Sequence, residues 1–259
     1  MHSPRLHVIL ACVFLGACTP TTFSGQTDPR SAISAYRESF SDAAGSELVD
    51  SVQRNDLLTL ISNGRNLWLG DHHRHSRLHA LQTELLKQLQ HRGMSMAFGL
   101  EAVGVRDEPL IRDFLANRID LRTLRERMLA RWPGSWLDDR DLDPWFYQSL
   151  LIMAKRHRIP VFALEPTPRL SLHSRDAYIA QTVARARERY PDRLIVTVLG
   201  QAHLLGQGDV IHRSGCRGVV IGGQPTTRLM AKSPTALPPG GCWRTDSEVL
   251  WFTEMFQVQ

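Results

Sequence analysis

The chain alternates short apolar runs with longer stretches of helical periodicity, and this alternation restricts its fold more than any other feature. The apolar runs are predicted strands at residues 66–70, 95–100, 159–164, 194–199, 219–221 and 249–252. Apolar residues at i, i+3 and i+4 spacing predict helices at residues 76–91, 109–116, 121–130, 144–157 and 175–190. Parallel strands need crossover connections, which are usually helices. We therefore predict an α/β fold with a mostly parallel central sheet and helices on both faces.

The first 17 residues have the form of a secretory signal, with Arg5 ahead of a short apolar run and small residues at the end. The sequence LGAC, ending at Cys18, resembles a bacterial lipobox, which implies cleavage before this cysteine and a lipid on it. Cleavage after Gly16 or Ala17 without lipid is the alternative. Thr19 does not resemble the aspartate that retains lipoproteins in the inner membrane. We expect a lipid-anchored protein of the bacterial outer membrane, on its periplasmic or surface face.

Residues 18–30 are polar and are expected to form a tether, and residues 31–259 have a length typical of one domain. No later run is long and apolar enough to cross a membrane. Loss of residues 1–17 removes Arg5 and lowers the net charge from +5 to +4. This excess is dispersed, so we exclude a nucleic-acid partner. Cys216 and Cys242 follow the signal, and in an oxidising periplasm they either pair or stay free.

Polar residues follow four of the predicted strands. In parallel sheets, ligands bind beyond the carboxyl ends of the strands, where loops and helix N-termini converge. Buried carboxylates and imidazoles need partners, which can be each other, a metal or a substrate. The predicted site therefore combines the residues at these four strand ends: Asp71, His73, Glu101, Glu165 and His203.

Several neighbouring residues have two interpretations. His79 either points back to the site or caps the helix in which it lies, whereas His72 and His75 are expected to be exposed. Tyr147 lies in an aromatic patch that suits either porphyrin stacking or the core. Arg175-Asp176 is interpreted as an internal ion pair at a helix start.

The motifs resemble a known family. GDHHRHSRLHALQTELL at residues 70–86 is followed in order by GLEAV, RDAYIA and VLGQAHL. Over roughly residues 55–215, the chain resembles the ChaN-type haem-binding lipoproteins, within the superfamily of Tiki, TraB and erythromycin esterase proteins. The resemblance implies an α/β sheet fold and a role in haem or iron uptake. Asp71 stands where the family more often has Glu, and no tyrosine is matched to the family's haem ligand.

Two functions follow from these observations, and the resemblance favours the first. An uptake lipoprotein would bind haem or an iron complex through Tyr147, His79 and Arg74, with Arg77 and Arg169 also near the propionates, and two copies could enclose the haem as a homodimer. A metal-dependent esterase or peptidase would place a divalent transition metal among donor residues, with His73 or Glu101 taking the proton from water. The resemblance to the hydrolytic branches implies these donors: Asp71, His73, Glu101 and His203.

Overall fold

The computed structural model describes residues 29–131, 137, 143–232 and 240–256. The predicted signal at residues 1–17 and most of the predicted tether lie outside the described residues. The described helices include none that is long and apolar enough to span a bilayer.

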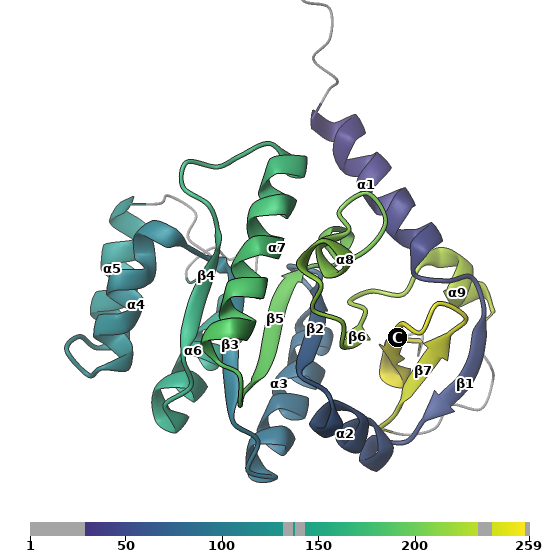
Figure 1. Ribbon diagram of the computed structural model, residues 1–259, viewed down its shortest axis with the longest axis horizontal. Coiled ribbons are helices and arrows are strands. Elements are labelled where there is room, and N and C mark those ends of the chain that lie inside the picture. The colour runs from purple at the N-terminus through teal and green to yellow at the C-terminus, as the bar shows by residue number, and fades with distance from the viewer. Residues whose placement is uncertain (1–28, 132–136, 138–142, 233–239, 257–259) are drawn as a thin grey trace, which may run out of the picture.

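An eight-stranded sheet organises the chain, in the order β1-β7-β8-β6-β2-β5-β3-β4 (Figure 1). The strands from β8 to β4 along this order pair in parallel, and β1 and β7 form an antiparallel edge. The strand bounds are β1 Leu48–Val52, β2 Asn66–Asp71, β3 Met96–Gly104, β4 Val161–Glu165, β5 Leu194–Gly200, β6 Val219–Ile221, β7 Cys242–Thr245 and β8 Leu250–Phe252. The predicted α/β class with a mostly parallel sheet is confirmed.

Helices connect the parallel strands, as the periodicity predicts. Their bounds are α1 Pro29–Ala43, α2 Arg54–Asn63, α3 Ser76–His91, α4 Glu108–Leu115, α5 Leu121–Arg131, α6 Pro144–His157, α7 Leu172–Arg189, α8 Val210–Ser214 and α9 Thr227–Ala231. Short 3-10 turns follow three strands: η1 Val105–Asp107, η2 Gln201–His203 and η3 Thr253–Phe256. Helix α7 packs alongside β4 and β5 (Figure 1).

The central strands are buried along their whole length. Every residue of β2 and β3 is buried, although successive side chains of a strand point to opposite faces. Other elements therefore cover both faces of the sheet at these strands. The continuous apolar runs of β2, β3 and β5 explain why the sequence predicts them well.

The antiparallel edge was not predicted, because its strands lack that signal. Strand β1, with the sequence LVDSV, exposes 55% of Val49 and carries polar residues. Helix α9 was not predicted either, and its N-cap Thr226 accepts a hydrogen bond from the backbone N–H of Leu229. Cys216 and Cys242 are both buried and free, so they do not pair.

Helix α2 offers a matched test of this packing. Leu57 is fully buried, whereas 42% of Leu60 is exposed on the same helix. We expect Leu57→Ala to lower the free energy of unfolding by about 2–5 kcal/mol, because it leaves a cavity. Leu60→Ala should change it by less than about 0.5 kcal/mol. Urea denaturation measures both, and equal losses would contradict the described packing.

Candidate functional site

The parallel strands bring the predicted site residues to one edge of the sheet. Strand β2 ends at Asp71, β4 ends at Glu165, and η2 places His203 directly after β5. Glu101 lies within β3, which pairs with both β4 and β5. The four residues are all buried, so their polar groups must be satisfied within the protein or by a ligand.

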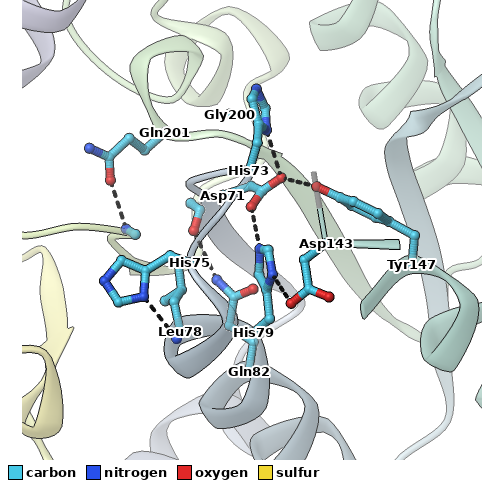
Figure 2. A network of polar contacts seen from close by, with 12 residues as sticks. Asp71, His73, His75, Leu78, His79, Gln82, Asp143, Tyr147, Gly200 and Gln201 are labelled. Atoms are coloured by element: carbon cyan, nitrogen blue, oxygen red, sulfur yellow. Dashed lines mark hydrogen bonds and ion pairs between the residues drawn. The ribbon is translucent and has the colours of Figure 1, made fainter. Parts of the chain in front are cut away.

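Asp71 is the centre of one polar network (Figure 2). Its Oδ1 lies 2.7 Å from His79 Nε2, and its Oδ2 lies 3.1 Å from His73 Nδ1. The Tyr147 hydroxyl donates a 2.5 Å hydrogen bond to the same Oδ2. Burial alone would raise the pKa of Asp71, but the hydrogen bonds and positive charge of the two histidines outweigh it and lower this pKa far below its ordinary value. Asp71 is therefore an ionised buried carboxylate.

His79 is committed to two carboxylates. Besides Asp71, it contacts Asp143 Oδ2 through Nδ1 at 2.9 Å, and its ring stacks on Phe146 with centroids 4.0 Å apart. Both ring nitrogens of His79 therefore face carboxylate oxygens. His79 points back to the site, and the N-cap of α3 is His75, whose Nδ1 accepts from Leu78 N–H at 3.5 Å. His75 is half-buried and His72 is exposed.

A second network joins β3, β4 and α7 through Arg175. This guanidinium donates to Glu101 Oε1, and its Nε lies 2.8 Å from Glu165 Oε2. Glu101 also accepts a 2.6 Å hydrogen bond from the backbone N–H of Gly200. Burial raises the pKa of Glu165, against the opposing charges of Arg169 and His203. Two buried carboxylates thus share one buried cation.

The third network orients His203. Its Nδ1 lies 2.6 Å from Asp176 Oδ1, and the Tyr36 hydroxyl donates to Asp176 Oδ2 at 3.0 Å. The prediction that Arg175 and Asp176 pair with each other is wrong, because they bind different partners. Sequence reasoning missed Tyr36, which belongs to no motif and is 140 residues from Asp176.

The three networks meet at Gly200. A Cβ built on this glycine would lie 3.4 Å from Glu101 Oε2, 3.5 Å from His203 Cδ2 and 3.8 Å from His73 Cε1. Both of these ring carbons are bonded to Nε2, while the Nδ1 atoms of the two imidazoles contact aspartates. The missing side chain of Gly200 therefore leaves a small space between two oriented imidazoles and a carboxylate.

In this structure, Tyr147 and His79 are not positioned to bind haem. Tyr147 is 2% exposed with its hydroxyl on Asp71, and both nitrogens of His79 contact carboxylates. An axial ligand needs an accessible donor atom. Arg74 is exposed, as a propionate contact requires. Within the described residues, no three His, Cys, Asp or Glu side chains are grouped so that they could hold a metal ion, and this applies to the predicted donors Asp71, His73, Glu101 and His203.

The Asp71 network predicts a pH-dependent stability. Asp71→Asn keeps the shape but removes the charge that faces His79, so we expect a loss of about 3 kcal/mol in the free energy of unfolding at pH 7. Because folding depresses the pKa of Asp71, its contribution is full above the unfolded value of about 3.9 and falls as the pH drops further. Denaturation experiments between pH 7 and pH 3 should show that the difference in free energy of unfolding between the two proteins becomes smaller as the pH falls. A difference that stays constant over this range would contradict the charged network.

Comparisons with known proteins address the family and the fold. Residues 57–173 match the family model described as "Haem-binding uptake, Tiki superfamily, ChaN". No curated protein matches the chain significantly.

Two similar solved structures are the type III effector HopBA1 and RRSP, a MARTX toxin effector domain from Vibrio vulnificus CMCP6. HopBA1 is 18% identical with a TM-score of 0.46, and the match covers 61% of this chain and 77% of HopBA1. RRSP is 20% identical with a TM-score of 0.47, over 70% of this chain and 39% of RRSP. As the motifs predict, the chain is similar to the ChaN haem-binding uptake family of the Tiki superfamily, and the match covers residues 57–173.

Proposed function

We propose that the carboxyl edge of the sheet is an acid–base centre that hydrolyses an ester or amide bond. One observation carries this proposal: two imidazoles, each held by an aspartate at Nδ1, face the same space at Gly200. An aspartate at Nδ1 fixes the tautomer and orientation of the ring, so that Nε2 can exchange a proton with a reacting group. Such groups typically contribute about 10²–10⁴-fold to a rate.

The reaction needs a proton acceptor on one side of the scissile bond and a proton donor on the other. One imidazole takes a proton from water as the water oxygen bonds to the carbonyl carbon. The bond to the leaving group breaks, and the leaving group takes a proton from the other ring in its imidazolium form. Glu101 Oε2 accepts a hydrogen bond from the attacking water, and Arg175 compensates the charge of this carboxylate. His73 and His203 are therefore the proposed catalytic residues, and Glu101 orients the water.

Haem binding is the second candidate, and the match of residues 57–173 to a haem-binding uptake family supports it. Because Tyr147 and His79 are committed to Asp71, we propose the exposed His72 as the axial ligand. Arg74 is exposed two residues further along the same loop and would contact a propionate. Trp145 is the first aromatic residue of α6 and is 76% exposed. Its ring is therefore accessible for stacking on a porphyrin face.

The N-terminal residues suggest where in the cell the chain is located. We propose that lipid on Cys18 anchors it to the outer membrane, as its lipobox-like LGAC sequence indicates. A homodimer that encloses haem is part of the second candidate only.

Hydrolysis is tested with a panel of p-nitrophenyl esters and fluorogenic peptides. We expect His73→Ala and His203→Ala each to lower kcat/KM by about 10²-fold or more, because each removes a proton-transfer group. Gly200→Ala should also lower it, since the added methyl fills the space between these rings. His212→Ala is the control, because the side chain of this histidine is 82% exposed and contacts Asp209 on the surface. Activity that survives both site variants would refute the proposal.

Haem binding is tested by titrating hemin into the chain and following the Soret band. If the second candidate holds, we expect a saturable shift that His72→Ala removes and Tyr147→Phe leaves intact, since the Tyr147 hydroxyl faces Asp71. Loss of the shift in Tyr147→Phe, with folding retained by circular dichroism, would instead restore Tyr147 as the ligand. The absence of any saturable shift would exclude haem carriage.

A further inference from the structure

Helix α1 contributes to the site from outside the segment that matches the family. We propose that Tyr36 is a positioning residue, which holds Asp176 and, through it, His203. The role of Tyr36 in catalysis rests on the hydrolytic function proposed above, whereas its effect on the geometry of His203 does not.

The contacts of Asp176 provide the first argument. Asp176 is fully buried, and its two carboxylate oxygens are divided between the imidazole of His203 and the hydroxyl of Tyr36. The Tyr36 ring also packs edge-on against the His203 ring, with centroids 6.0 Å apart. Burial, followed by the charge of Asp176, raises the pKa of Tyr36 to about 12. The hydroxyl is therefore a neutral donor at neutral pH.

A carboxylate with one strong partner can turn about its terminal torsion, because that torsion is broad and nearly two-fold. The hydroxyl of Tyr36 occupies the second oxygen and so removes this freedom. The plane of Asp176 then sets the direction of the hydrogen bond to His203 Nδ1, and with it the direction of Nε2. Tyr36 thus acts on the reacting atoms only through these two residues.

Helix α1 is firmly attached, so that it can hold Tyr36 in place. Phe40 is 1% exposed and packs edge-on against Trp251 of β8. Ser39 Oγ accepts a 2.8 Å hydrogen bond from the backbone N–H of Gln207, shortly after η2. At Gly206, which has a φ of +67°, a Cβ would lie 2.5 Å from the carbonyl oxygen of Ser39. The turn after His203 therefore packs directly against the same helix that carries Tyr36.

The test removes only the hydroxyl. We expect Tyr36→Phe to lower kcat by about 10-fold while KM changes by less than about twofold, because substrate contacts remain and ring orientation is lost. Tyr190→Phe is the matched control, because Tyr190 follows the last residue of α7 and Asp176 lies near the start of this helix. An unchanged kcat in Tyr36→Phe, or an equal loss in the control, would overturn the proposal.

A double-mutant cycle distinguishes positioning from a separate effect. If Tyr36 acts through Asp176, then Tyr36→Phe combined with Asp176→Asn should lose no more kcat than Asp176→Asn alone. If the fold-losses in kcat of the two single variants multiply in the double variant, Tyr36 acts independently and the proposal is overturned.

A spectroscopic measurement needs no activity. In proton NMR, the Nδ1–H of His203 should give a downfield resonance that Asp176→Asn removes and Tyr36→Phe broadens through faster exchange with water. If the wild-type chain hydrolyses nothing, the proposed function fails, and this resonance alone decides the role of Tyr36. A resonance that is unchanged in Tyr36→Phe would overturn it.

Discussion

The buried carboxylate of Asp71 is the interaction on which the rest of the site depends. Removing this charge from water is costly, and the cost is offset only because two imidazoles and a phenol bind it. These groups come from three places along the chain: the loop after β2, helix α3 and helix α6. Asp71 therefore fixes two helices against the end of β2 and determines where His73 lies.

Helix α7 has the corresponding role on the other side of the site. Arg175 and Asp176 are adjacent in sequence, and both are buried near the start of this helix. Successive helical residues point about 100° apart, so the two side chains reach different partners. Arg175 pairs with both Glu101 and Glu165, while Asp176 orients His203. One helix end thus supplies a cation to the carboxylates and an anion to the imidazole.

The sequence predicts the parallel strands and the edge where the polar groups meet, because continuous apolar runs and strand-end residues are local signals. It fails where the signal is not local. The composition around Tyr147 suggests ring stacking, but cannot reveal that the hydroxyl faces Asp71. Tyr36 lies in a segment for which no helix was predicted, and its partner is distant in sequence. The edge strand β1 was missed because a half-exposed polar strand resembles a loop.

The two halves of the site differ in what they imply about function. Asp71 and Glu101 lie within residues 57–173, the segment that matches a haem-binding uptake family, whereas Asp176 and His203 lie beyond it. Haem carriage by an exposed histidine would not require a second buried pair of aspartate and imidazole. Burying Asp176 has a desolvation cost, and its contacts offset that cost while orienting the ring toward Gly200. This arrangement is what proton transfer needs, and it favours chemistry at the carboxyl edge over storage of a ligand there.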